Sequence, residues 1–212
     1  MTARGWVLLA GFAVLAAAWS GPLPELSRRL FSAHMLMHVA VIAIAAPLLA
    51  IGIAGDRFDP VPRAPKTFSP IPASIIELVV VWAWHAPALH HLARGSAAML
   101  VIEQASFLGA GLLVWMSALG GSRVQRRERA VAGVSGLLLA SMHMTLLGVL
   151  LALAGRPLYV HGIQAAFGLT PLEDQHLGGV IMLLAGGAAY LAGALYRVSG
   201  LLKERGDAVS AG

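Results

Sequence analysis

The sequence predicts an all-α protein that crosses a membrane about six times. Of its 212 residues, 58% are hydrophobic and 12% are charged, whereas a soluble domain carries about 25% charged residues. Mean hydropathy is +0.77. The apolar residues fall into long runs with short polar segments between them, and a helix of roughly 20 residues spans a bilayer. We therefore expect one transmembrane domain over residues 1–212 and no sizeable soluble part.

Charge and cysteine content exclude several kinds of protein. The net charge is +5, and the basic residues gather between the apolar runs, which indicates membrane topology rather than nucleic-acid binding. The chain has no cysteine, so disulfides and thiolate metal sites are excluded. Any metal would bind through His, Met, Asp or Glu. The sequence has no visible nucleophile–base arrangement or phosphate-binding loop, so we do not expect an enzyme.

The first three spans are predicted to cover residues 5–21, 32–52 and 71–92. The first is also compatible with a signal peptide, since Ala16-Ala17-Ala18 resembles a cleavage region, but we favour a retained span. Pro47 is expected to kink the second span, because proline removes a helix hydrogen bond. Pro87 is expected to distort the end of the third span for the same reason.

The last three spans are predicted to cover residues 97–119, 130–154 and 171–198. The sixth span starts with Thr170 and Glu173 at the spacing of a capping box, with Pro171 at the first helical position. The paired glycines Gly178-Gly179 and Gly186-Gly187 predict close packing against a neighbouring helix.

Basic residues predict the orientation in the membrane. Six spans place both termini on one side. If the basic segment 123–129 is cytoplasmic, eleven of the fifteen Lys and Arg residues fall on that side. The four on the outer side are Arg28, Arg29, Arg94 and Arg156. The positive-inside rule then predicts cytoplasmic termini.

Two histidines open the second apolar run. His34 and His38 are four residues apart, so they share one face of a helix, and Met37 lies on nearly the same face. Imidazole and thioether are ligands that suit copper, and thioether particularly suits Cu(I). A polar residue in a span is expensive, which makes it a candidate functional residue. The alternative is that both histidines only hydrogen-bond to neighbouring helices.

Further polar residues lie in the outer half of the predicted bundle. At 1.5 Å per residue, four of them lie roughly 7–10 Å below the outer ends of their spans. They are His38, His85, Glu103 and His176. His143 lies deeper, at roughly 17 Å. His90, His91 and His161 are assigned to the outer surface, and no histidine to the cytoplasmic side. This distribution predicts a ligand-rich layer but does not show that the residues converge.

Some of these residues also have structural explanations. Asp174 lies in the first turn of the sixth span, where a carboxylate favours the helix dipole. Within Met142-His143-Met144, neighbours are about 100° apart on a helix, so His143 is the best candidate ligand of the three. Glu77 is placed near the cytoplasmic side, where we expect it to pair with an arginine.

Several stretches of the chain occur together, in the same order, in a known family. They are Phe31 to His38 with Ala46 to Leu49, Trp84-His85-Ala86-Pro87, Glu103 to Phe107 leading to Trp115, Leu147-Gly148, and Pro171 to Gly179. On these residues the sequence resembles the polytopic CtaG-like cytochrome c oxidase assembly factors. Two positions differ from the usual pattern: Gln104 replaces a histidine, and His176 replaces a glutamine.

The resemblance implies a role in maturing a haem-copper oxidase, by handling copper at the outer face of the inner membrane of a bacterium. The implied partners are oxidase subunits and a periplasmic copper chaperone. Taking residues and resemblance together, we expect His34 and His38 at the core of a site for copper, as Cu(I). The further candidates are His85, His143, Met37, Glu103 for charge compensation, and Asp174 and His176 as ligands or orienting groups. Two alternatives remain: a haem b-binding protein and a metal-free scaffold for an oxidase subunit.

Overall fold

The computed structural model describes residues 2–159 and 168–210, with side chains through residue 203. The described residues form helices and no strands, which confirms the all-α part of the predicted fold class. The first half contains α1 (Ala3–Trp19), α2 (Leu23–Arg29), α3 (Phe31–Val39), the π-helix η1 (Ala40–Ala45), α4 (Ala46–Ile53), α5 (Pro70–His85) and α6 (Pro87–Gly95). The second half contains α7 (Ala97–Leu119), α8 (Arg123–Glu128), α9 (Ala130–Ala152), α10 (Pro171–Ile181), the π-helix η3 (Met182–Gly186) and α11 (Gly187–Ser210).

Between four and six segments of this chain are suited to crossing a membrane. Four continuous helices among the described residues are long and apolar enough: Phe31–Ile53, Ala97–Leu119, Ala130–Ala152 and Pro171–Lys203. Two bent helix pairs meet the same test only when each pair is taken together, namely α1 with α2 and α5 with α6. The fourth predicted span, 97–119, coincides with α7, and the others agree to within a few residues at most of their ends.

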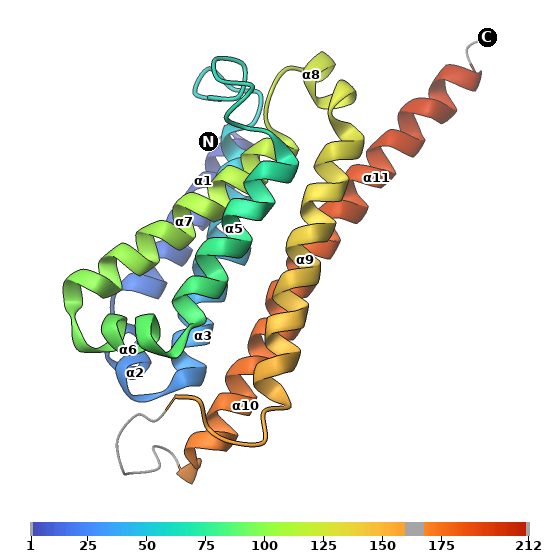
Figure 1. Ribbon diagram of the computed structural model, residues 1–212. Coiled ribbons are helices and arrows are strands. Elements are labelled where there is room, and N and C mark those ends of the chain that lie inside the picture. The colour runs from blue at the N-terminus through green and yellow to red at the C-terminus, as the bar shows by residue number, and fades with distance from the viewer. Residues whose placement is uncertain (1, 160–167, 211–212) are drawn as a thin grey trace.

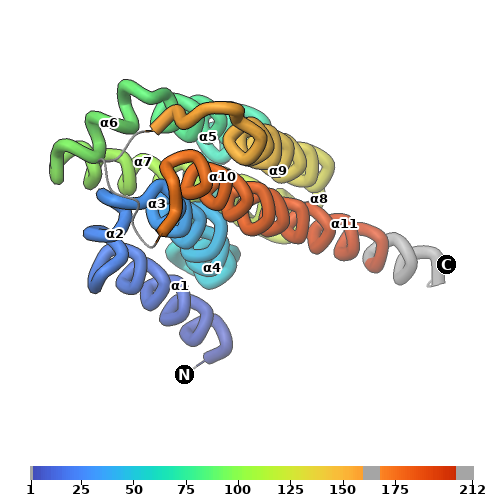
Figure 2. The backbone as a smooth tube through the Cα atoms, turned by 90° about the horizontal axis from the view of Figure 1, so that it is seen from below, coloured from blue at the N-terminus to red at the C-terminus, as the bar shows by residue number. Residues whose placement is uncertain are grey.

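The long helices run alternately up and down the bundle (Figure 1). The start of α1 and the end of α11 lie toward the same end of the molecule, which is the arrangement that an even number of spans requires. Figure 2 looks along the bundle and shows α3 between α2 and α10, with α5 and α7 beside it. Because α3 carries His34 and His38, this central place puts both histidines inside the bundle.

The second span is irregular just before its proline. Residues 40–45 form the π-helix η1, and α4 then starts with Ala46 and Pro47. Proline has no backbone N–H to donate to the preceding turn. A π-helical segment inserted in an α-helix accommodates such an interruption and is frequent at functional sites. The predicted distortion at Pro47 therefore takes the form of a π-segment on its N-terminal side.

The third span breaks at the predicted proline. The helix pair α5 and α6 bends by 72° across this break. Ala86, between the two helices, has the extended backbone angles φ −64° and ψ 131°. A residue that precedes proline is driven out of the α-region by the proline ring. As a result, α6 turns across the end of the bundle instead of continuing outward.

Small residues bring α9 and α10 into backbone contact. A Cβ added to Gly179 would lie 2.5 Å from the backbone nitrogen of Ala152, and one on Gly148 would lie 2.7 Å from the nitrogen of Leu183. Neither position has room for a side chain. This confirms the predicted close packing at Gly178-Gly179 and holds α10 against the rest of the bundle.

The arrangement in Figure 1 predicts the result of a topology experiment. Reporter fusions inserted in the segment 121–129 and after residue 212 should both report the cytoplasm, because basic residues resist translocation. A fusion in the segment between α6 and α7 serves as the control and should report the opposite side. A C-terminal fusion that reports the outer side would contradict the topology.

Candidate metal centre

The site begins with the way the N-terminus of α3 is held. The carboxylate of Asp174 on α10 accepts hydrogen bonds from the backbone N–H groups of Phe31 at 2.6 Å and Ser32 at 3.1 Å, and from the Ser32 hydroxyl. A helix N-terminus has unpaired N–H donors and a partial positive charge, so a carboxylate fits it well. Asp174 thus fixes the register of the helix that carries both central histidines.

Two histidines and one carboxylate converge inside the bundle. His34 and His38 on α3 and Glu103 on α7 each offer a possible ligand atom, and these atoms lie within 4.8 Å of one another. The His34 and His38 rings have centroids 4.0 Å apart, as their i, i+4 spacing predicts. His34 Nε2 is 3.4 Å from Glu103 Oε1. All three side chains are buried, and imidazole with carboxylate is a donor set that several divalent metals accept.

Among the described residues, Glu103 is the only acidic member of this cluster. The side chains of His34, Arg94 and Gln104 approach its carboxylate. Arg94 Nη2 lies 3.1 Å from Glu103 Oε2 and 3.5 Å from His34 Nε2. The Gln104 amide donates to the same carboxylate oxygen at 3.4 Å. The side-chain oxygen of Gln104 accepts a hydrogen bond from Trp19 Nε1 at 3.3 Å. The charge of Glu103 is thus compensated from α3, α6 and α7.

Two further residues beside the cluster are buried, so their predicted placement at the surface of the bundle is wrong. His90 is fully buried, and its ring centroid is 4.8 Å from that of His34. Arg94 was counted as an outer-loop arginine but is almost entirely buried in its ion pair with Glu103. Depth counting assumed a straight third span, whereas the bend at Pro87 folds α6 back over the histidines. Pro87 was the feature of the sequence from which this bend could have been predicted.

An aromatic residue packs against the residues that surround the cluster. Tyr159 follows α9, and its ring lies 4.4 Å from the rings of both Phe31 and His90. Its hydroxyl donates to the carbonyl oxygen of His85 at 2.5 Å. Burial raises the pKa of Tyr159, so the hydroxyl stays protonated and keeps this donor role. His161, which was placed in the same loop, lies outside the described residues.

His85 lies next to the cluster with a methionine that was not predicted. Its ring centroid is 5.3 Å from that of His38. His85 Nδ1 is 2.7 Å from the carbonyl oxygen of Val81, and Nε2 is 3.4 Å from the sulfur of Met35. The predicted sulfur ligand was Met37, yet Met37 points to a groove beside Trp19 and Gln104. The structure brings Met35, and not Met37, to a histidine.

Three other predicted site residues lie elsewhere in the structure. Asp174 contacts the N-terminus of α3, as described above. His176 Nε2 is 2.9 Å from the carbonyl oxygen of Ala154, at the end of α9. His143 belongs to a separate buried group, where its Nε2 is 3.6 Å from Glu77 Oε2. The expectation that Glu77 pairs with an arginine is wrong, because the Tyr190 hydroxyl donates a hydrogen bond to the Glu77 carboxylate instead.

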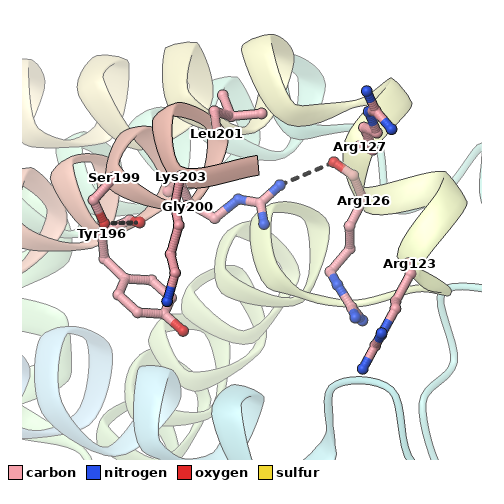
Figure 3. A pocket seen from close by; sticks show the side chains of 9 residues that line it. Arg123, Arg126, Arg127, Tyr196, Ser199, Gly200, Leu201 and Lys203 are labelled. Atoms are coloured by element: carbon pink, nitrogen blue, oxygen red, sulfur yellow. Dashed lines mark hydrogen bonds between the residues drawn. The ribbon is translucent and has the colours of Figure 1, made fainter. Parts of the chain in front are cut away.

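A large basic groove lies at the opposite end of the molecule from the histidines (Figures 1 and 3). It has a volume of about 600 Å³ between α8 and α11. Figure 3 shows Arg123 and Arg126 facing Lys203 and Tyr196 across it, and Arg197 donates to the Arg126 carbonyl oxygen at 2.9 Å. Among the described residues that line it, none is acidic. The groove gathers the positive charge that defines the predicted cytoplasmic side and is unconnected with the metal-ligand cluster.

Comparison with known proteins identifies the family of this chain. The model of the family described as cytochrome c oxidase caa3 assembly factor (Caa3_CtaG) matches residues 2–204. The chain belongs to this family. The resemblance inferred from the sequence is thereby confirmed over nearly the whole chain. No curated protein and no solved structure matches it.

Membership gives the general role of the molecule. A caa3 assembly factor serves in the assembly of a cytochrome c oxidase, so oxidase subunits are its expected partners. The apolar helices of this assembly factor indicate that it works in a membrane. Membership of an assembly-factor family favours a non-catalytic role. The matched range includes all the residues of the His34–His38–Glu103 cluster.

The Arg94–Glu103 pair predicts a non-additive effect on stability. Arg94→Met leaves a buried carboxylate without its cation and should lower the free energy of unfolding by about 3–5 kcal/mol. Combining it with Glu103→Gln removes the uncompensated charge, so the double variant should be less destabilised than Arg94→Met alone. Denaturation in detergent of the wild-type protein, both single variants and the double variant measures the four free energies of unfolding.

A second ion pair in the same chain provides the control. Arg29 and Glu25 form an exposed i, i+4 pair at 2.9 Å, and exposed pairs contribute little. The matched variants Arg29→Met and Glu25→Gln should change stability far less. Equal effects at both pairs, or strictly additive effects at Arg94 and Glu103, would show that the buried charge is not the controlling factor.

Proposed function

We propose that this assembly factor handles copper for a haem-copper oxidase, at the end of the bundle where α3 begins. The observation that carries the proposal is the convergence of His34, His38 and Glu103, whose ligand atoms lie within 4.8 Å of one another. The positive-inside orientation makes this end periplasmic. Copper would arrive there from a periplasmic copper chaperone and pass to an oxidase subunit.

The donor atoms of the cluster suit a bound cation. Glu103 Oε1 is buried and accepts no hydrogen bond among the described residues, although His34 Nε2 lies 3.4 Å away. His38 Nε2 is likewise buried without a hydrogen-bond partner in the described part of the chain. Unsatisfied buried polar atoms are costly, and a metal ion satisfies both imidazole and carboxylate. The carboxylate also supplies the negative charge that a buried cation needs.

Arg94 suits a site that must release its metal. Its guanidinium contacts the Glu103 carboxylate at 3.1 Å, so a cation bound there shares the charge of Glu103 with Arg94. The repulsion between the two positive charges weakens metal binding. Weak binding is a disadvantage for a permanently bound cofactor. It suits a copper ion that must be released to an oxidase subunit.

The same ion pair favours a second candidate function, a metal-free scaffold for an oxidase subunit. Arg94 places a positive charge beside Glu103 without any metal ion, so the cluster also suits a structural network that holds α3, α6 and α7 together. In that case the histidines serve packing and hydrogen bonding only. The two functions differ in one measurable property, which is whether the purified protein retains copper.

Haem b receives less support from the geometry than copper does. The rings of His34 and His38 lie 4.0 Å apart, and the cavity that His38 and His85 both line has a volume of about 10 Å³. Pockets for organic ligands usually have volumes of about 300 Å³ or more. Purified protein without a Soret absorption band would remove this alternative.

Replacing both central histidines tests the copper function. The double variant His34→Ala, His38→Ala removes two of the three ligands, so the Cu(II) that the purified protein binds should fall at least about tenfold. Oxidase activity of cells that carry the variant should fall with it. Metal analysis of the purified protein and an oxygen-consumption assay measure the two effects.

His91→Ala is the matched control, because His91 is an exposed histidine at the same end of the bundle. It should leave copper content and oxidase activity unchanged. Unchanged copper in the double variant, with the protein inserted at normal levels, would refute the ligand assignment. Lost oxidase activity with unchanged copper would assign the histidines to the scaffold function.

A further inference from the structure

A narrow cavity lies directly beside the metal-ligand cluster. Its volume is about 10 Å³, close to the space that one water-sized ligand occupies. The helices α3, α5, α7 and α9 and the π-helices η1 and η3 all contribute to its wall. Every residue that lines it is buried. The cavity is therefore internal to the bundle and is of the size of a single ion.

The wall of this cavity is unusually rich in soft ligand atoms. Three of the eight methionines in the chain line it, namely Met35, Met144 and Met182, together with His38 and His85. Methionine is a common filler of irregular gaps in a core, so a single one carries no inference. Here, by contrast, three methionines and two histidines surround one small space. They come from α3, α5, α9 and η3 and together form a possible set of metal ligands.

The contact between His85 and Met35 indicates what the space would hold. His85 Nδ1 lies 2.7 Å from the carbonyl oxygen of Val81, which only accepts hydrogen bonds, so Nδ1 carries the proton. In the neutral ring Nε2 then presents a lone pair, and it lies 3.4 Å from the sulfur of Met35. Thioether sulfur is also an acceptor. Two electron-pair donors that face each other inside a protein are best satisfied by a cation between or beside them.

The neighbouring histidine presents a second unsatisfied atom. His38 lines the same cavity, and its Nε2 is buried without a hydrogen-bond partner among the described residues. A backbone carbonyl fixes the His85 ring in the tautomer that leaves Nε2 free, which is how metal-binding histidines are commonly oriented. The cavity thus has one pre-oriented imidazole, one unsatisfied imidazole and three thioethers.

We propose that this cavity is a second metal site, selective for Cu(I). The proposal rests on the proposed function only for its biological purpose, which is copper handling. Thioethers favour Cu(I) over zinc and over harder divalent ions. All five side chains can bind as neutral ligands, and burying a single positive charge costs less than burying two. No redox step is involved, because copper enters the cavity already as Cu(I).

The position of His38 connects the two sites. Its ring lies 4.0 Å from that of His34 in the outer cluster and 5.3 Å from that of His85 in the cavity. The imidazole of His38 therefore belongs to both the imidazole–carboxylate site and the thioether-rich site, and we expect copper to pass between the two sites at this ring. The outer cluster is the exchange position beneath Tyr159, and the cavity is the inner position in which Cu(I) is kept from water.

Replacing the three sulfurs tests the cavity. The variant Met35→Leu, Met144→Leu, Met182→Leu conserves volume, and such exchanges are well tolerated in cores. Its affinity for Cu(I), measured by competition with a Cu(I) chelator, should fall by about tenfold or more. Cu(II) binding at His34, His38 and Glu103 should not change. The control variant Met99→Leu, Met142→Leu replaces methionines outside the cavity and should retain wild-type Cu(I) affinity.

X-ray absorption of the Cu(I)-loaded wild-type protein gives an answer even if the triple variant does not fold. Sulfur ligands at copper support the cavity, and their absence overturns it, as does unchanged Cu(I) affinity in the triple variant. The variant His34→Ala, Glu103→Gln tests the outer cluster separately from the cavity, through its Cu(II) binding. If wild-type protein binds Cu(I) through sulfur but that variant shows unchanged Cu(II) binding, the outer site falls and the cavity stands.

Discussion

A negative charge buried in the bundle governs this end of the molecule. Glu103 is fully buried on α7, and an ionised carboxylate in a low-dielectric interior is stable only with a compensating charge and hydrogen bonds. Arg94 from α6 and His34 from α3 provide them, with Gln104 beside it. Helix α3 and the consecutive helices α6 and α7 must therefore meet at one carboxylate, and a bound cation is a further way to satisfy it.

Two local features of the chain make that meeting possible. The proline at position 87 turns α6 by 72° across the end of the bundle and carries Arg94 inward. Asp174 anchors the N-terminus of α3 to α10, which in turn packs against α9 through glycines that leave no space for a side chain. The first feature brings the compensating cation, and the second fixes the depth of His34 and His38. The proposed Cu(I) cavity lies where α3 and α9 meet α5, α7 and the π-helices η1 and η3.

Sequence reasoning succeeded where local pattern determines structure. Hydropathy predicted α7 to the residue, and the i, i+4 spacing predicted that His34 and His38 share a face toward the core. It failed where distant segments meet. His90 and Arg94 were misplaced because depth was counted along a straight helix, and Met37 was preferred to Met35 because nothing local shows which methionine faces α5. The pairing of Glu77 with Tyr190 is likewise a contact across 113 residues.

The central claim is that the carboxylate and the two histidines around it bind a metal ion, and electron paramagnetic resonance of copper tests it most directly. The wild-type protein, in lipid nanodiscs and given one equivalent of Cu(II), should yield one ordered spectrum with hyperfine splitting from imidazole nitrogens. A spectrum identical to that of copper in buffer, or no copper retained after desalting, would contradict the claim. The cluster would then be an ion-pair network that holds the helices together.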